Sequence, residues 1–589
     1  MEKKTLIKYL KPYTKAMAFG LFIKLIGTFA DLGLPRVLAL ILNKIIPQNN
    51  IGLVFIWGGI MVVLAVLARL FNIIANRRAS RVASDVTCTI RHDLFEKINR
   101  LSGRQMDKFS IPSLISRMTA DSYNINRTIG SMQRMGVRAP ILMLGGLIIT
   151  ATMDPVMTLV LLAVIPILVL IVFGISRKTI PMFKNVQEKL DRLVDVLREN
   201  ITGIRVIKAL SKTEHEKKRF RGVNDELVDV ELKAAYTMAA SSPLMNFVLN
   251  MGLVGVIIVG AYRVNRGVAL PGTIIAVLSY FAMILNSILM MNRILIQINQ
   301  MSASSTRIME VLSEPEDLVP LLPENTPAEY FAENGISCEE VPGAPLISFE
   351  NVSFRYSEGG DLCLENINLN IKKGESLGII GATGCGKTTV VNLLMRFYDV
   401  TSGAVRINGR DVRTMPVDEL HKRFGVAFQN DVIFADTIYE NISFCRNLEQ
   451  TLVEEAAEDA QGGFINELGA GTDESKFMYR AAIKGANLSG GQKQRLLIAR
   501  AFAGKPEILI LDDSSSALDY KTDANLRKAI RKNYDDSTLI MIAQRVSSVM
   551  YCDNICVMDD GRIIGYGKHE DLLKNCEVYR EIYSMQMEA

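Results

Sequence analysis

Long stretches without charge limit what this chain can fold into more than any other feature of its sequence. Four of them are uncharged and mostly apolar: Ile51–Ala68, Val156–Ser176, Ala234–Tyr262 and Gly267–Asn292. About 20 such residues cross a bilayer core as a helix. A strand would leave its backbone groups unsatisfied in lipid, so each stretch predicts a membrane-spanning helix.

Two further stretches complete a predicted set of six spanning helices. Ala139–Met153 is short, but a helical pattern extends it back through Gly136. Ala16–Leu42 is apolar except for Lys24, Asp31 and Arg36. Ionisable residues inside a span are candidates for a polar cavity or pathway.

Lys24 and Asp31 are seven residues apart, which places them on nearly the same helix face. They are therefore candidates for a substrate cavity. In the alternative, the Lys24 side chain extends to the interface and Asp31 lies near the outer surface. Weaker cavity candidates are the span amides Asn246, Asn250 and Asn286, because amides also bond between packed helices.

Basic residues predict the orientation of the spans. Lys and Arg gather between the second and third spans and again between the fourth and fifth, whereas the other connections are short. Because cytoplasmic segments carry the excess of Lys and Arg, both termini and both long segments are expected in the cytoplasm. We expect a multi-pass protein of a bacterial plasma membrane, with helices that continue beyond the bilayer.

An acidic, proline-rich stretch divides the chain. Residues 313–346 contain eight acidic residues, six prolines and no Lys or Arg, a composition that predicts an extended tether. The predicted domains are therefore an all-α membrane domain at 1–312, this linker, and a second domain at 347–589. In the second domain strand-like runs alternate with helical ones, which is typical of a parallel α/β sheet. The pairs are Ser376–Ile380 with Thr388–Phe397, Ile508–Leu511 with Asn525–Asn533, and Thr538–Ala543 with Ser547–Tyr551.

A glycine-rich loop predicts nucleotide binding. The residues that follow the strand at Ser376–Ile380 fit the pattern G-x-x-x-x-G-K-[ST], in which backbone N–H groups cradle phosphate oxygens. Lys387 supplies a cation near the β and γ phosphates, and Thr388 offers its hydroxyl to Mg²⁺. The binding candidates here are Gly381, Ala382, Thr383, Gly384, Cys385, Gly386, Lys387, Thr388 and Thr389.

Two more motifs surround this site. The apolar run Ile508–Leu511 ends in Asp512, and a carboxylate at the carboxyl end of a parallel strand suits the Mg²⁺ shell. Ser489, Gly490, Gly491 and Gln492 begin another helix with a hydroxyl and flexible N–H groups, which is a second anion site. One chain does not need two γ-phosphate cradles, so this one is expected to close on a nucleotide held by a second domain.

These residues resemble the ATP-binding cassette (ABC) exporters, in particular half-transporters with one six-span domain and one nucleotide-binding domain. The resemblance covers nearly the whole chain. It implies that Tyr356 stacks on adenine and that Gln429 is the glutamine linking Mg²⁺ to the membrane domain. It also implies that Asp519 belongs to the D-loop and that Leu114–Asp121 and Glu199–Arg205 surround two intracellular coupling helices. ATP and Mg²⁺ are the implied cofactors, and the cassettes pair head to tail.

Two positions depart from the family pattern. The family glutamate that polarises the attacking water is Asp513 here, one methylene shorter, and about an ångström of misplacement can cost on the order of a hundredfold in rate. The family switch histidine is Gln544, which cannot be protonated. Leu488–Gln492 matches the family signature LSGGQ, and the segment Ile483–Gly485 ahead of this signature is altered as well. We therefore expect a heterodimer, in which this chain's own site binds ATP but hydrolyses it poorly while Ser489–Gln492 completes the partner's site.

The predicted function is a subunit of an ATP-driven exporter of amphipathic compounds such as drugs, lipids or peptides. The alternative is a nucleotide-gated channel or a regulatory membrane subunit, which an impaired site also suits. Eight scattered cysteines and four separated histidines argue against a disulfide scaffold and a His-based metal enzyme. No basic run interleaved with aromatic residues points to nucleic acid.

Overall fold

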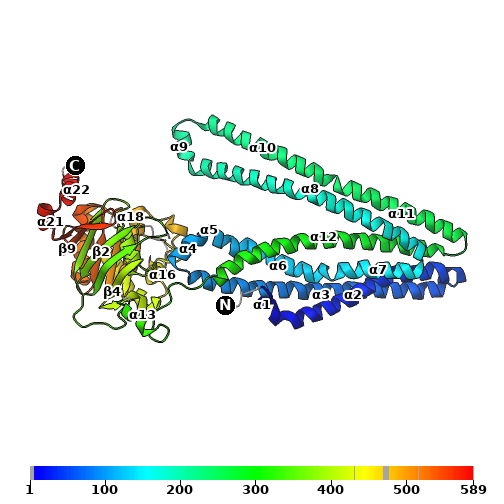
Figure 1. The fold of residues 1–589 in the computed structure, drawn as a ribbon, viewed down its shortest axis with the longest axis horizontal. Coiled ribbons are helices and arrows are strands. Elements are labelled where there is room, and N and C mark those ends of the chain that lie inside the picture. The colour runs from blue at the N-terminus through cyan, green and yellow to red at the C-terminus, as the bar shows by residue number, and fades with distance from the viewer. Residues whose placement is uncertain are drawn as a thin grey trace. The chain divides into compact units, whose positions relative to one another are not determined.

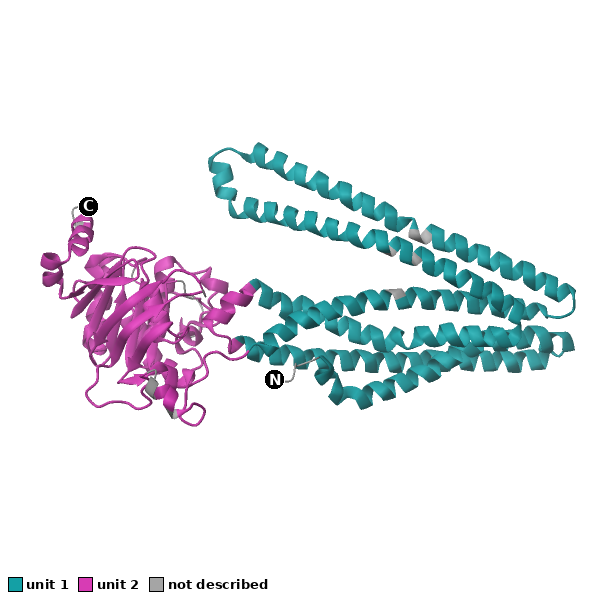
Figure 2. Cartoon of the chain, in the orientation of Figure 1, with its two compact units in different colours: residues 1–98, 112–314 teal, residues 99–111, 315–589 magenta. Residues whose placement is uncertain are grey.

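The computed structural model describes residues 6–333, 335–357, 359–429, 432–468, 476–514 and 516–587. It divides into two compact units, coloured separately in Figure 2. Unit 1 comprises residues 1–98 and 112–314, and unit 2 comprises residues 99–111 and 315–589. The predicted domains at 1–312, 313–346 and 347–589 are a different division, because residues 99–111 and most of the predicted linker group with unit 2.

Unit 1 is entirely helical in its described part. Six helical stretches among the described residues are long and apolar enough to cross a membrane: Leu6–Gln48, Ile51–Asn99, Ile111–Met153, Pro155–Thr202, Thr213–Asn265 and Pro271–Ser313. The prediction of six spanning helices is confirmed. Their main helices are α1 (Leu6–Leu10), α2 (Thr14–Leu40), α3 (Ile51–Asn99), α5 (Ile111–Ser116), α6 (Ser122–Ser131), α7 (Arg138–Met153), α8 (Pro155–Thr202), α10 (Thr213–Ala239), α11 (Ser241–Asn265) and α12 (Pro271–Ser313).

Several of these helices are much longer than a bilayer is thick. Helix α3 has 49 residues and α8 has 48, so each is roughly 70 Å long against a hydrocarbon core of about 30 Å. The expected extension beyond the membrane is therefore present. Asp154 begins α8 by accepting hydrogen bonds from the backbone N–H groups of Val156 and Met157, with Pro155 at the first helical position.

Two apolar clusters hold the helices of unit 1 together. Met157 and Leu161 of α8 pack with Val256 of α11 and Phe281 of α12 in one cluster. In the other, α2, α7 and α12 meet around Tyr280, whose hydroxyl donates to the Leu32 backbone oxygen at 2.6 Å. Beyond the first cluster, α8 and α10 run side by side as a hairpin that is closed by α9 (Ile204–Ala209) (Figure 1).

Unit 2 contains two sheets. The larger has the strand order β10-β9-β3-β8-β7-β6, and β9, β3, β8, β7 and β6 are parallel. Its strands are β3 (Ser376–Gly381), β6 (Phe424–Ala427), β7 (Ile508–Asp512), β8 (Thr538–Ile542), β9 (Asn554–Asp559) and β10 (Arg562–Gly567). The predicted parallel α/β sheet is confirmed, with all three predicted strands in it.

The second sheet was not predicted from the sequence. It is antiparallel, with the order β2-β1-β4-β5. Its strands are β1 (Ile347–Phe354), β2 (Leu364–Ile371), β4 (Ser402–Ile407) and β5 (Arg410–Asp411). One apolar cluster joins the two sheets, with Phe349 and Val352 of β1 packed with Ile379 of β3 and Ile510 of β7.

Helices cover the larger sheet and carry the predicted motifs. They are α14 (Lys387–Leu394), α15 (Val417–His421), α16 (Ile438–Ser443), α17 (Gln450–Asp459), α18 (Gly490–Phe502), α19 (Tyr520–Asn533), α20 (Val546–Val549), α21 (His569–Asn575) and α22 (Glu577–Met587). Helix α4 (Gly103–Phe109) also belongs to this unit, where the Gly103 N–H donates to Phe397 O at 3.2 Å.

The acidic stretch after residue 313 is not the free tether that its composition predicts. The Leu321 N–H donates to Arg413 O, and the Val341 N–H donates to Asn408 O, each at 2.8 Å. Arg423 forms a 2.7 Å ion pair with Glu340. The stretch also contains a short helix, α13 (Ala328–Glu333). It therefore lies along unit 2, held by these backbone bonds and by the pair of Arg423 with Glu340.

Candidate nucleotide site

The glycine-rich loop connects β3 to α14, as predicted. Two of its glycines are required by close approach of the backbone. A Cβ atom at Gly381 would lie 2.1 Å from Met558 O, and one at Gly386 would lie 2.5 Å from Leu364 Cδ2, where φ is +98°. Only glycine fits such positions without strain. The loop therefore turns tightly between these two glycines and presents its backbone N–H groups as a cradle for phosphate oxygens. The residues between the two glycines are Ala382, Thr383, Gly384 and Cys385.

Lys387 is positioned at the inside of this loop. Its ammonium donates to Gly381 O at 2.9 Å and to Ala382 O at 2.8 Å. Helix α14 begins at this residue, so its positive end points at the same place. A cation and a helix N-terminus that meet over a backbone cradle are suited to bind phosphate.

Thr388 and Asp512 meet at the edge of the cradle. The Thr388 hydroxyl donates to Asp512 Oδ2 at 3.0 Å, although the residues are far apart in sequence. Asp512 ends β7 and is 1% exposed, and this burial raises its pKa, while the bond from Thr388 opposes the shift. A hydroxyl and a carboxylate at this spacing fit an Mg²⁺ ion bridging the phosphates of a nucleotide.

Asp513, Gln429 and Gln544 meet next to that pair. Both amides donate to the same atom, Asp513 Oδ2, and each donor nitrogen lies 3.1 Å from it. Burial raises the pKa of Asp513, and the bond from Gln429 opposes the shift. All three residues line one cavity of about 180 Å³ together with Thr383, Gly384, Lys387, Thr388, Thr389 and Asp512. We call Gln429, Asp513 and Gln544 the switch edge of the site.

Tyr356 lies beside the helix that follows the loop. Its hydroxyl is 3.0 Å from Thr389 Oγ1. Its ring packs edge-on against Phe354 and Tyr398, with centroid distances of 4.9 and 5.2 Å, and the side chain is 41% exposed. An aromatic face that is fixed and open at this position can accept a nucleotide base.

The signature residues begin α18. Ser489 is the N-cap: its Oγ accepts from the Gln492 N–H at 3.3 Å, and Gln492 Oε1 accepts from the Ser489 N–H at 2.8 Å. These two bonds form a reciprocal capping box. A Cβ atom at Gly490 would meet nothing within 4 Å, and one at Gly491 would lie 3.4 Å from Ala517 O. Asp519 similarly begins α19 by accepting from the Thr522 N–H at 2.9 Å.

Sequence reasoning assigned no role to Gln494 or Arg545. Gln494 Nε2 lies 3.3 Å from Asp513 O, and its Oε1 accepts from the Ala517 N–H at 2.9 Å. Gln494 therefore joins α18, the helix that begins with the signature residues, to Asp513 and the segment after it. The backbone of Asp513 has a φ of +49°. The guanidinium of Arg545 lies over the ring of Tyr520, 5.9 Å from its centroid. The sequence signal for both was their place within two residues of a motif.

The membrane candidates are not gathered into one described cavity. Lys24 is 2% exposed and donates to Asn76 Oδ1 at 2.9 Å, while Asp31 pairs with Arg138 at 2.8 Å. The two do not bond to each other, and both the cavity prediction for Lys24 and its alternative stay open. Asn246, Asn250 and Asn286 are exposed on α11 and α12. That these residues line a substrate cavity stays a prediction.

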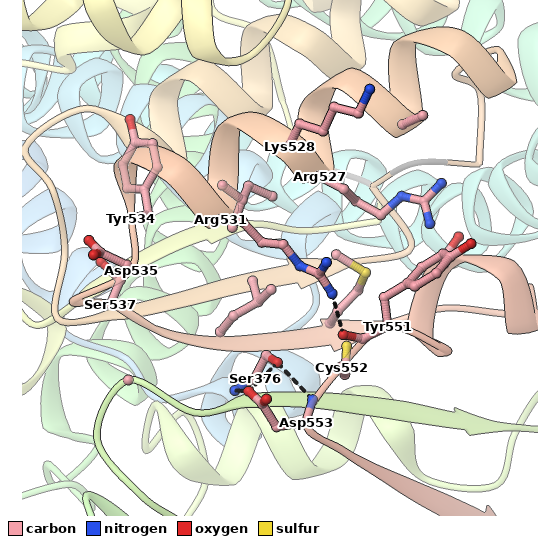
Figure 3. Close-up of a pocket in the computed structure, with 16 residues that line it drawn as sticks. Ser376, Arg527, Lys528, Arg531, Tyr534, Asp535, Ser537, Tyr551, Cys552 and Asp553 are labelled. Carbon is pink, nitrogen blue, oxygen red and sulfur yellow. Dashed lines mark hydrogen bonds between the residues drawn. The ribbon is translucent and has the colours of Figure 1, made fainter. Parts of the chain in front are cut away.

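A larger cavity of unit 2 lies away from the glycine-rich loop (Figure 3). It has a volume of about 520 Å³ and lies between α19 and the segment from α20 to β9. Arg527 and Arg531 of α19 cross to that segment, donating to Ser547 O at 2.7 Å and to Tyr551 O at 2.6 Å. These bonds tie α19 to the backbone that follows Gln544.

Comparison with known proteins matches both halves of the chain. Residues 17–288 match the ABC transporter transmembrane region, and residues 364–516 match the ABC transporter domain. An uncharacterized ABC transporter ATP-binding protein of Mycobacterium tuberculosis is 32% identical over 584 residues, which is 98% of this chain and 97% of that protein. YfiB of Bacillus subtilis, which bears the same description, is 32% identical over 98% of both chains.

Two further similarities are informative. The ATP-dependent lipid A-core flippase of Syntrophus aciditrophicus is 29% identical over 510 residues, covering 86% of this chain and 81% of that protein. A solved structure of a bacterial Atm1-family ABC exporter with ATP bound shares the fold, with a TM-score of 0.77 over 98% of each chain and 21% identity. The chain therefore belongs to the ABC transporter family, as an integral membrane half-transporter of the exporter type with six transmembrane helices and one ATP-binding domain.

Proposed function

We propose that this chain is one half of a heterodimeric exporter of amphipathic compounds. Its own nucleotide site, formed by the glycine-rich loop and Asp512, holds ATP and hydrolyses it slowly. Its Ser489–Gln492 segment completes the competent site of a partner half-transporter. The chain is an ABC exporter subunit and uses ATP. What we propose is which of the two nucleotide sites of the dimer hydrolyses ATP and which class of compound is transported.

The main support is the arrangement around Asp513. Its carboxylate is one methylene shorter than a glutamate, and the amides of Gln429 and Gln544 both donate to its Oδ2. A general base must reach the proton that it removes, so a short carboxylate engaged by two amides is poorly placed to activate water. The side chain of Gln544 is a neutral amide, which cannot take up a proton as the imidazole of a histidine can.

The binding residues of the same site support ATP retention. The loop from Gly381 to Gly386 keeps its tight turn, Lys387 faces its carbonyls, and Thr388 bonds to Asp512. Bound ATP would be held by this cradle, Mg²⁺ by Thr388 and Asp512, and the base by Tyr356. These groups bind and orient the nucleotide, while the group that would activate water is the altered one.

Exposed apolar residues support a second chain. Around α9, at the end of the hairpin formed by α8 and α10, four side chains are largely exposed: Ile201, Ile204, Val206 and Leu210. Apolar residues gathered at the end of a hairpin mark an interaction surface. We assign this end, with the Glu199–Arg205 stretch, to docking on the partner's ATP-binding domain, which requires the domain and both termini to be cytoplasmic.

The substrate class rests on the apolar spans and on one relative. The flippase of Syntrophus aciditrophicus carries a lipid, and unit 1 exposes polar amides at Asn246, Asn250 and Asn286 among apolar side chains. A surface with both characters suits amphipathic molecules, with Lys24 and Asp31 as candidates for contact with a polar head group.

The test is to purify the chain alone and together with a half-transporter that carries glutamate and histidine at the positions of Asp513 and Gln544. We expect ATPase activity from the pair that is at least tenfold above that of the lone chain, and little further loss when Asp513→Asn is introduced. Brisk hydrolysis by the lone chain that does not depend on the partner would contradict the proposal. ATP-dependent uptake by sealed inside-out vesicles distinguishes an exporter from a gated channel, which conducts without turnover.

A further inference from the structure

The C-terminal helix α22 contacts the backbone on both sides of Arg545, the residue that follows the switch residue Gln544. Gln586, near the end of α22, accepts from the Val546 N–H through Oε1 at 2.8 Å and donates to Gln544 O through Nε2 at 2.8 Å. One side-chain amide thus satisfies a backbone donor and a backbone acceptor two residues apart. A neighbouring strand makes the same pair of bonds in a sheet.

Among the residues that the structure describes, no strand is paired with residues 544–546. The parallel pairing of β8 with β7 ends at Ile542, and the Ala543 N–H donates to Ile379 O at 3.2 Å. Residues 544 and 545 are irregular, and Val546 begins the four-residue helix α20, whose first N–H has no partner within the helix. Because Val546 is fully buried, an unsatisfied N–H there would be costly.

Helix α22 is itself firmly held at its base. Tyr579 is fully buried in the same apolar cluster as Val546 and Val549, and its hydroxyl lies 2.7 Å from His569 Nδ1. Helix α22 lies at the C-terminal end of the chain (Figure 1), and its buried base supports Gln586 near its other end. On the opposite side, Arg527 binds Ser547 O, so the segment from Gln544 to Ser547 is held from two directions.

We propose that Gln586 is a positioning residue of the nucleotide site: α22 fixes the backbone of residues 544–546 and so holds the Gln544 side chain against Asp513. Thr388 and Asp512 would hold the Mg²⁺ of bound Mg²⁺-ATP, and Asp513 is the next residue along the chain. The Gln544 amide donates to Asp513 and lines the same cavity as Lys387, so it would lie near the terminal phosphate of bound ATP, a group that ADP lacks.

The first test is hydrogen–deuterium exchange of the full-length chain in lipid nanodiscs. Gln586→Ala removes both bonds, so the amide of Val546 should exchange about five- to tenfold faster. Met585→Ala is the matched control, because Met585 is the preceding residue on the same helix and is 73% exposed. Gln586→Glu keeps the acceptor for Val546 and should preserve most of the protection.

The second test separates positioning from general loss of structure. Gln586→Ala should weaken Mg²⁺-ATP binding about three- to tenfold and leave Mg²⁺-ADP binding within twofold, whereas Met585→Ala should change neither. Unchanged exchange at Val546, or an equal loss of ATP and ADP binding, would overturn the proposal. Both readouts are independent of turnover, so they stand even if the proposed slow hydrolysis at this site is wrong.

Discussion

The signature segment and the switch edge of unit 2 differ in how their functional groups are used. At the signature segment, Ser489 and Gln492 satisfy each other's backbone groups, and the glycines between them stay open. At the switch edge, two amides engage the one carboxylate that would act on water. Gln494 connects the two regions directly, so both belong to one well-ordered structure.

If the proposed function is correct, the alteration of this site is local rather than general. A site that had lost its function by drift would be expected to lose its glycines, its lysine or its signature as well. Here the departures from the family pattern are Asp513, Gln544 and the segment Ile483–Gly485, whereas Lys387, Thr388 and Ser489–Gln492 match it. A division of labour between two unequal sites explains this selectivity, and each prediction below tests one side of it.

The largest expected effect is on the signature segment. Ser489→Ala should lower the ATPase activity of the assembled pair about a hundredfold, because the proposed function places this hydroxyl against the partner's nucleotide. Lys387→Ala acts on this chain's own slow site and should lower the same activity less than fivefold. Steady-state ATPase measurements on the purified pair check both. Equal losses of ATPase activity, or a larger loss from Lys387→Ala, would contradict the proposed asymmetry between the two nucleotide sites.

A gain of function tests the switch edge. Asp513→Glu combined with Gln544→His should raise hydrolysis at this chain's own site by about tenfold or more, because the longer carboxylate reaches the attacking water. The measurement is single-turnover hydrolysis on the pair whose partner site is inactivated. Asp513→Asn with Gln544→His is the matched control and should give no gain. If both double variants behave alike, the length of the carboxylate is not what limits this site.

A smaller effect is expected on nucleotide affinity. Tyr356→Ala removes the aromatic face and should weaken ATP binding about tenfold, a loss of about 1.4 kcal/mol that is in the range of aromatic stacking. Tyr356→Phe keeps the ring and loses only the contact with Thr389, so it should weaken binding less than threefold. Titration with a fluorescent ATP analogue measures both. Equal effects would place the base elsewhere.

The sequence predicted the parts of this fold that depend on short-range pattern. Uncharged runs located the six spans, and the apolar run that ends in Asp512 located β7, because a strand buried on both faces is continuously apolar. Thr388 and Asp512, which the sequence assigned to one Mg²⁺ shell, are distant in sequence and are joined by a hydrogen bond of 3.0 Å.

What the sequence did not predict depends on long-range contacts. The antiparallel sheet has mixed polar and apolar strands, and its pairing of β1 with both β2 and β4 leaves no local signature. The composition of the acidic stretch predicted a tether. Its contact with unit 2 was not predictable, because Arg423, the partner of Glu340, lies far along the chain. In the same way, the bonds of Gln586 to Gln544 and Val546 span about forty residues.

The smallest predicted effect separates the two roles of Ser489. Its hydroxyl caps α18 within this chain, so Ser489→Ala should also destabilise that helix by about 1 kcal/mol and speed exchange of the Gln492 amide roughly fivefold. Asn is as good an N-cap as Ser, so Ser489→Asn should keep the Gln492 amide protected while still losing most ATPase activity of the pair. Exchange of the Gln492 amide and ATPase activity are measured on the same preparations. If Ser489→Asn restores activity along with protection, the serine acts through the helix cap alone, and the signature segment no longer differs from the switch edge in the way proposed here.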